Sequence, residues 1–310
     1  MEPVIPKYFN IAGPCVPGEH YMLPAVERLP KARQLAERKQ YFVIHAARQS
    51  GKTTLLRALT REINAAGRYY ALYCSLEELQ GIADFDRGLA MIVYALNGAA
   101  ATSPIFQARH AEPRPIGNEV TGIRFALSGI AALLDKPLIL FFDEADCLSG
   151  QPLITFLRQL RNGYVNRDET PFPWSIALAG MRDIRDFKAK VRSDSEALGS
   201  ASPFNIVTNA LTLGNFTVEQ VAALYRQHTD ATGQTFEPEA VERAWYWSEG
   251  QPWLVNALAR QVVEDDLGGD PSIPVTSSHI DNAADALMKR RDTHIDSLLD
   301  RLKEPRVQRV

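Results

Sequence analysis

Four short apolar runs divide the first two thirds of the chain. They are YFVIHA from Tyr41, YYALYCSL from Tyr69, PLILFFDEADCL from Pro137 and WSIALAG from Trp174. Near-continuous apolar runs are typical of strands buried on both faces, and helical segments separate them here. This alternation predicts a parallel sheet covered by helices on both faces. The stretch 99–122 is rich in Pro, Gly and Ala without periodicity, so we expect a loop or insertion there.

Helical signals replace the strand pattern after Leu213. Thr217, with Gln220 three residues later, predicts a capping box at the start of one helix. Pro238 suits the first turn of the next helix. Gly250 is expected to end that second helix, because a helix commonly stops at a glycine.

Two further helices are expected before the end of the chain, one beginning at Pro252 and one near Ser278. The last has an intermittent apolar face formed by Ile280, Ala284, Leu287, Leu298 and Leu302. We therefore expect a core over residues 1–212, which includes an N-terminal leading segment, and a helical domain over 213–310. The predicted fold class is α/β: a three-layer αβα parallel sheet followed by a smaller all-helical domain.

The stretch HAARQSGKTT joins the first apolar run to a helical segment. It fits the phosphate-binding pattern G-x-x-x-x-G-K-[ST], except that Ala46 stands at the first glycine. That glycine serves the tight exit from the strand, so alanine is acceptable if its φ angle stays negative. Backbone N–H groups of such a loop surround phosphate oxygens. The residues expected to supply them are Gln49, Ser50, Gly51, Lys52, Thr53 and Thr54.

Two loop side chains and an acidic strand end have expected chemical roles. Lys52 would place its ammonium on the β and γ phosphate oxygens, and Thr53 would give its hydroxyl to Mg²⁺. In LILFFDEAD, Asp143 and Glu144 follow an apolar strand, where carboxylates are avoided unless they face a site. Asp143 is expected to hold Mg²⁺ through water, and Glu144 to orient and polarise an attacking water. Asp146 is expected to be a capping or solvated residue.

With both motifs in place, the chain resembles the P-loop ATPases of the AAA+ and STAND type. It is most similar to the bacterial and archaeal AAA-like ATPases related to the origin-recognition group. The loop differs from the family's common PRQSGKTTLL at Ala47, where proline is usual, and FFDEAD matches its acidic strand end. SIALAGMRDIRDF resembles the family's next strand, which makes Arg182 the candidate sensor of the γ-phosphate. The alternative is a surface arginine paired with Asp183 or Asp186.

Two other stretches resemble the family near its nucleotide base. EGQPWLVNAL is similar to the G-x-P element of the helical lid, with Gly250 and Pro252 in the matching places. The resemblance implies that this helix start lies against the base and ribose, whereas the residues alone indicate only a helix break. FNIAGPCVPGEHYMLP looks like the family's N-terminal segment beside the adenine. There His20 or Tyr21 could contact the base, or could simply pack in a loop.

Composition bears mainly on partners and compartment. The 310 residues are 45% hydrophobic and 23% charged, as in a soluble globular protein, and no run approaches membrane-spanning length. The formal net charge of -3 does not support binding of DNA by bulk electrostatics. Cys15, Cys74 and Cys147 lack the spacing of a zinc site or a disulfide framework. Without a secretory signal pattern, we expect a cytoplasmic protein with no membrane partner.

The last helical stretch, KRRDTHIDSLLDRLKEPRVQRV, is locally basic. It could form a nucleic-acid patch, or a solvated helix of mixed charge because acidic residues interleave. An apolar stripe there is expected to need a cover: a domain beyond Val310, a second copy of the chain, or the core itself. The stripe consists of Ile295, Leu298, Leu299 and Leu302.

These observations together predict a Mg²⁺-dependent ATPase, a hydrolase that acts as a molecular switch. ATP or ADP would control lid closure and contacts with a protein effector or within a homo-oligomer. The alternative is an ATP-gated adaptor with little turnover that recruits DNA or a nuclease or other effector. Stimulation of turnover by DNA or partner distinguishes the two. A P-loop kinase is a third possibility. It is disfavoured because Asp143 and Glu144 suit activation of water, and because the sequence indicates no binding site for a phosphate acceptor.

Overall fold

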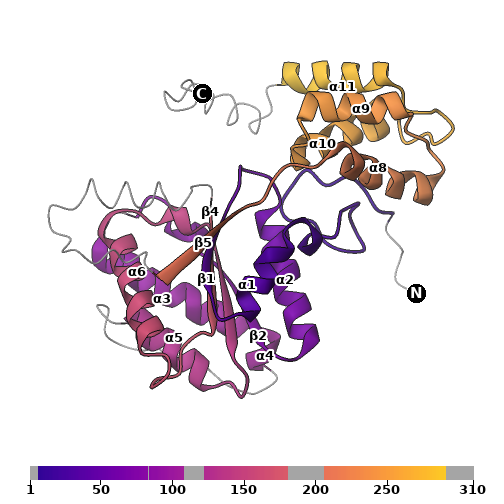
Figure 1. Cartoon of the computed structure of the whole chain (residues 1–310). Coiled ribbons are helices and arrows are strands. Elements are labelled where there is room, and N and C mark those ends of the chain that lie inside the picture. Colours follow the sequence, from indigo (N-terminus) through magenta and orange to yellow (C-terminus); the bar gives the residue numbers. More distant parts are fainter. Residues whose placement is uncertain (1–5, 83, 108–121, 181–205, 291–310) are drawn as a thin grey trace. The chain divides into compact units, whose positions relative to one another are not determined.

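A computed structural model describes residues 6–82, 84–107, 122–180 and 206–290 of the protein (Figure 1). Residue contacts divide the chain into two units. The first, Pro24–Gly214, is the α/β unit, and the second, the helical unit, combines Met1–Leu23 with Asn215–Val310.

The N-terminal segment belongs to the helical unit, not to the α/β core over 1–212 where the sequence analysis placed it. Its aromatic side chains explain the difference. Phe9 and Tyr21 are buried in the apolar core of the helical unit, and the Phe9 ring centroid lies 5.7 Å from that of Tyr225. Apolar and aromatic residues of this size release about 1.5–3 kcal/mol each on burial, which is enough to attach a segment that has no regular secondary structure.

The described part of the α/β unit forms one five-stranded sheet. Its strands are β1 (Tyr41–His45), β2 (Tyr70–Ser75), β3 (Leu138–Asp143), β4 (Ser175–Gly180) and β5 (Val207–Thr212). Neighbouring strands pair in parallel in the order β2-β3-β4-β1-β5. This confirms the predicted α/β fold. Strand β5 was not predictable from an apolar run, because VTNALT mixes polar and apolar residues in a partly exposed edge strand.

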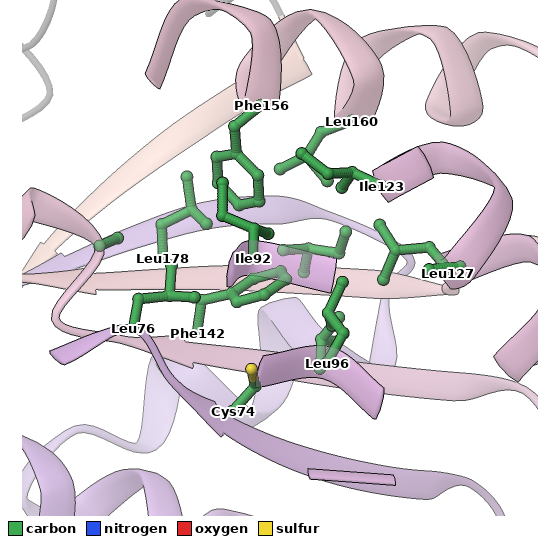
Figure 2. Packing of buried hydrophobic residues seen from close by; sticks show 14 of the residues in the cluster. Cys74, Leu76, Ile92, Leu96, Ile123, Leu127, Phe142, Phe156, Leu160 and Leu178 are labelled. Carbon is green, nitrogen blue, oxygen red and sulfur yellow. The ribbon is translucent and has the colours of Figure 1, made fainter. Parts of the chain in front are cut away.

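Helices cover both faces of this sheet. The helical segments in the described part of the unit are η1 (Val26–Arg28), α1 (Pro30–Glu37), α2 (Lys52–Ala66), η2 (Glu77–Leu79), α3 (Phe85–Thr102), α4 (Pro104–Gln107), α5 (Gly122–Ala132), η3 (Ala145–Cys147) and α6 (Gly150–Val165). Helices α1 and α2 pack on one face, and α3, α5 and α6 pack on the other. Figure 2 shows this second layer, where Phe142 and Leu178 of the sheet pack with Ile92 and Phe156 of the helices.

Part of the stretch 99–122 is helical, which corrects the expectation of a loop. Helix α3 continues through the alanines at 99–101, and α4 follows after one intervening residue. Alanine is the strongest helix former, and Ala100 and Phe106 are buried in the core, so composition and packing both favour helix. Residues 108–121 lie outside the described residues.

The helices of the helical unit follow Gly214, the last residue of the α/β unit. Among the described residues, its elements are α8 (Val218–Thr232), α9 (Pro238–Ser248), α10 (Pro252–Arg260), the π-helix η5 (Gln261–Asp266) and α11 (Ser277–Arg290). The capping box is confirmed: the Thr217 side chain accepts from the Gln220 N–H, and the Gln220 side chain accepts from the Thr217 N–H. Pro238 and Pro252 stand at the first positions of α9 and α10, as predicted.

Helix α9 ends at Ser248 with Glu249 as its C-cap, so it stops just before Gly250, whose neighbours admit no side chain. The φ of Gly250 is +71°, and a Cβ atom there would lie 1.9 Å from the Phe216 carbonyl oxygen. The apolar face expected on the last helix is buried at Ile280, Ala284 and Leu287. Its expected continuation at Leu298 and Leu302, like the stripe with Ile295 and Leu299, lies outside the described residues. Within the described ranges, no helix combines the length and apolar character needed to cross a membrane.

Candidate functional site

The phosphate-loop candidate leaves β1 at the carboxyl edge of the sheet and ends where α2 begins. Ala46 is buried, and its N–H donates to the Gly180 carbonyl oxygen (3.2 Å). Ala46 is not among the non-glycine residues with positive φ in the described ranges, so the condition set for alanine at this position is met. Gln49 (φ 59°) and Gly51 (φ 91°) adopt the left-handed conformation instead, and they turn the loop into the helix.

Lys52, the first residue of α2, places its charge inside this loop. Its side chain is buried, and its ammonium donates to the carbonyl oxygens of Ala46 (3.2 Å) and Ala47 (3.1 Å). The Ser50 hydroxyl donates to the same Ala47 oxygen (2.8 Å). First-turn N–H groups of a helix have no partner within the helix, and the helix dipole there favours an anion. A phosphate oxygen is therefore a chemically suitable replacement for the two carbonyls as acceptor of the Lys52 protons.

Arg28, which lies in η1 and outside the loop sequence, stabilises the loop by hydrogen bonding. Its Nη1 donates to the Ser50 carbonyl oxygen (2.9 Å), and its Nη2 donates to the carbonyl oxygen of Gly214 (2.8 Å), the last residue of the α/β unit. The approach is close, because a Cβ on Gly51 would lie 3.0 Å from Nη1. Arg28 was not among the predicted site residues, since no local sequence pattern connects it to a loop that lies more than 15 residues further along the chain.

Asp143, the last residue of β3, joins the acidic strand end to the loop. Its carboxylate is almost fully buried and accepts three hydrogen bonds. The Thr53 hydroxyl (2.6 Å) and the Tyr73 hydroxyl (2.9 Å) donate to Oδ2, and the Glu144 N–H (3.0 Å) donates to Oδ1. A buried carboxylate needs such donors to offset its lost hydration. Burial, and then the charge of Asp143, raises the pKa of Tyr73, so its hydroxyl keeps its proton and acts as the donor.

Glu144 projects from a strained turn beside this carboxylate. Its φ and ψ of 53° and 40° are left-handed, a conformation that costs a non-glycine residue on the order of 1 kcal/mol. Burial raises the pKa of its carboxyl, Lys52 lowers it, and the charges of Asp143, Asp146 and Glu77 raise it. The side chain thus lies within the field of both the loop cation and the acidic strand end.

Asp146 lies within η3 and not at its cap, and it is only partly exposed. A Cβ on Gly180 would come within 2.6 Å of its Oδ1, so the end of β4 leaves room for this carboxylate. Asp146 is thus not the N-cap of η3, whereas its partial exposure agrees with the expectation of a solvated aspartate. Its position between η3 and β4 was not readable from the sequence, because the two segments meet only in the fold.

The structure brings most of the predicted site residues together. The loop residues Gln49, Ser50, Gly51, Lys52, Thr53 and Thr54, with Asp143 and Glu144, all belong to the α/β unit. Pro252 belongs to the helical unit, where Gln251 caps α10 by accepting from the Leu254 N–H (2.6 Å). The sensor candidate Arg182, with Asp183 and Asp186, lies outside the described residues.

His20 and Tyr21 pack within the helical unit. The Val16 N–H donates to His20 Nδ1 (2.8 Å), so Nε2 carries the proton and donates to the Tyr8 hydroxyl (2.9 Å). Tyr21 is buried with its ring against Phe9, with centroids 4.8 Å apart. His20 thus has hydrogen-bond partners and Tyr21 a packing partner within the helical unit, which favours the packing interpretation over contact with a base.

The donor set fits a magnesium–nucleotide complex. Mg²⁺ prefers oxygen ligands and usually takes one or two from the protein, with the rest from phosphates and water. Thr53 and Asp143 supply such oxygens beside the Lys52 charge. Within the described part of the chain, no cluster of three or more His, Cys, Asp or Glu side chains could hold a metal.

Solved structures share this fold at low sequence identity. The Walker-type ATPase PABY2304 of Pyrococcus abyssi superposes with a TM-score of 0.64 and 16% identity, over 94% of this chain and 79% of that one. The Orc1 protein of Aeropyrum pernix, solved in complex with DNA, gives a TM-score of 0.56 and 14% identity, over 86% of this chain and 66% of that one. A search of the curated proteins finds no match.

Family membership rests on the sequence itself. The model of one family, described as the AAA-like domain, matches residues 25–270. The matched range contains the phosphate loop, the acidic strand end and four helices of the helical unit up to η5. The chain therefore belongs to the AAA-like domain family.

Proposed function

We propose that the protein binds ATP with Mg²⁺, hydrolyses it, and uses the nucleotide state as a switch of the AAA+ and STAND type. The observation that carries the proposal is the 2.6 Å hydrogen bond from the Thr53 hydroxyl to Asp143 Oδ2. It joins a glycine-containing loop with a buried lysine to a buried acidic strand end, the two parts that phosphoryl transfer to water needs. Membership of the AAA-like domain family supports the same function.

Binding is assigned to the loop. Lys52 exchanges its two carbonyl acceptors for β and γ phosphate oxygens, while the N–H groups from Gln49 to Thr54 surround the phosphates. Thr53 would give a lone pair of its hydroxyl to Mg²⁺ while it keeps donating its proton in the hydrogen bond to Asp143, and Asp143 would hold the ion through water. The ion held by these two residues would supply positive charge that offsets the charge of the phosphates.

Hydrolysis is assigned to two side chains. Glu144 orients and polarises the attacking water with its half-buried carboxylate, which lies in the field of Lys52. Arg182, from the stretch after β4, is proposed as the sensor of the γ-phosphate. ADP lacks that phosphate, so Arg182 would distinguish the two nucleotides.

The switch is assigned to the division of the chain after Gly214. Pro252, at the start of α10, is proposed to lie against the base and ribose when the helical unit closes on the nucleotide. A nucleotide shifts the equilibrium between an open and a closed state only by the difference between its affinities for the two states. Closure would then control contacts with a protein effector or with further copies of the chain.

A second candidate function is an ATP-gated adaptor that recruits DNA or a nuclease or other effector and turns over little. The Aeropyrum pernix Orc1 structure in complex with DNA favours considering DNA as the partner. The net charge of -3 does not. Turnover measured with and without DNA separates the two functions, because only the adaptor would bind ATP and remain almost inactive in both conditions.

The proposal is tested by Lys52→Ala against the parent protein. Loss of a charge-assisted contact of about 1.5–3 kcal/mol should weaken Mg-ATP binding roughly 10- to 100-fold in calorimetry. Lys39→Ala is the matched control, because Lys39 pairs with the exposed Asp168 and should leave the affinity unchanged. Equal affinities of the Lys52 variant and the parent would refute the proposed binding site.

A further inference from the structure

Tyr73 lies where a side chain can orient Asp143. Strands β2 and β3 are parallel neighbours, with Tyr73 opposite Phe141 and Ser75 opposite Asp143. Paired residues of neighbouring strands face the same side of a sheet, and residues two apart share that side. Tyr73 and Asp143 therefore face the same layer, that of α2, and the tyrosine hydroxyl reaches the carboxylate.

The hydrogen bonds give the two Asp143 oxygens different surroundings. Oδ2 accepts both the Thr53 hydroxyl (2.6 Å) and the Tyr73 hydroxyl (2.9 Å), whereas Oδ1 accepts the Glu144 N–H (3.0 Å). Thr53 is itself assigned to the metal, so its geometry changes with the ion. Tyr73 is not, so its hydroxyl is free of a metal-binding role and available to hold the carboxylate in place.

Arg57 fixes the tyrosine ring in turn. It stands one helical turn after Thr53 on α2, and its guanidinium lies 5.2 Å from the centroid of the Tyr73 ring. Such a cation–π contact contributes about 0.5–1 kcal/mol at a partly exposed site. The ring is thereby held between the helix that carries Thr53 and the strand that carries Asp143.

We propose that Tyr73 is a positioning residue that orients the Asp143 carboxylate for Mg²⁺. The proposal rests on the proposed function, because it assigns Tyr73 to the same magnesium–nucleotide site. Partners that orient metal-binding carboxylates by hydrogen bonding commonly change metal affinity 10- to 100-fold when removed. The phenolic hydroxyl, one oxygen on an otherwise apolar ring, can be removed with almost no change in shape.

The test is Tyr73→Phe, measured by ADP and ATP binding across a Mg²⁺ titration and in EDTA. We expect the Mg²⁺ concentration at half-maximal enhancement of binding to rise about tenfold, with affinity in EDTA unchanged within about twofold. Tyr69→Phe is the matched control, because the Tyr69 hydroxyl donates to the Glu37 carbonyl oxygen (3.3 Å) away from Asp143. It should leave both values as in the parent.

A double-mutant cycle makes the result specific. In an Asp143→Asn background, Tyr73→Phe should cause no further change in the Mg²⁺ midpoint, because the carboxylate it orients is gone. Additive effects, an unchanged midpoint in the single variant, or equal losses with and without Mg²⁺ would each overturn the proposal. Failure of the proposed function looks different, since the parent protein itself would then show no Mg²⁺-dependent nucleotide binding.

Discussion

At the scale of single residues, the adjacent carboxylates Asp143 and Glu144 at the end of β3 are suited to different roles. Asp143 is buried and hydrogen-bonded, so it is suited to holding an ion in place. Glu144, by contrast, has a left-handed backbone and a side chain that is only half-buried. Adjacent carboxylates thus have different surroundings, and the difference supports the proposed separation between metal binding and water activation.

Glu144→Gln is therefore expected to keep Mg-ATP affinity within about threefold while phosphate release slows by about 100-fold or more. The amide preserves the size of the side chain but cannot accept a proton from water. Calorimetry gives the first value and single-turnover phosphate release gives the second. Glu78→Gln, a change at an exposed residue of η2, is the control. Parent-like turnover in the Glu144 variant would contradict the assigned role.

At the scale of elements, the loop is held by contacts from both of its flanks. Lys52, at the start of α2, donates to a carbonyl oxygen of the loop. Arg28, from η1, donates to another loop carbonyl oxygen and to that of Gly214, the last residue of the α/β unit. A single guanidinium therefore links the phosphate loop to the segment that leads out of this unit. Since Arg28 contacts carbonyl oxygens of the protein, its effect on nucleotide binding should be indirect.

Arg28→Met should weaken ATP and ADP binding to the same extent, by about five- to tenfold, because two charge-assisted hydrogen bonds that order the loop are lost. The melting temperature should also fall. Arg33→Met is the control, because Arg33 forms partly exposed pairs with Glu37 and Glu62 that contribute about 0–1 kcal/mol. Loss of ATP affinity alone would instead indicate direct contact with the γ-phosphate.

At the scale of the whole molecule, the two units have separate apolar cores. The core of the helical unit contains a titratable group, His228, whose ring packs near Phe9 and Phe236. Its Nε2 is hydrogen-bonded to Gln234 Oε1 (2.9 Å). Burial lowers the pKa of His228 below its usual value, an effect that the Gln234 hydrogen bond and the charge of Glu264 only partly oppose.

The helical unit should consequently lose stability as the pH falls below about 6.5, the usual pKa of unfolded histidine. In that range the unfolded chain binds a proton that the folded unit excludes, so protonation favours unfolding. Full stability is present above that pH. His228→Gln should flatten the dependence between pH 8 and 5.5, measured by urea unfolding with tryptophan fluorescence. An identical pH slope in variant and parent would show that His228 does not carry the effect.

Features encoded by neighbouring residues were predictable from the sequence. The capping box needs only Thr217 and Gln220, three residues apart, and the phosphate loop needs one contiguous stretch between an apolar run and a helix. Near-continuous apolar runs likewise predicted four of the strands and their parallel sheet. In each case the interactions that form the structure are local, or the residue pattern directly reflects burial.

Tertiary structure alone decided which distant groups complete the site and which segments belong together. Tyr73 reaches Asp143 only because β2 pairs with β3, and Arg28 reaches the loop only because η1 packs beside it. Phe9 joins the helical unit by packing against residues more than 200 positions later. The sequence by itself determined the phosphate loop, the acidic strand end and the helix caps. The partners of these elements depended on chain topology, because burial and hydrogen bonding between distant segments leave no periodic pattern in either segment.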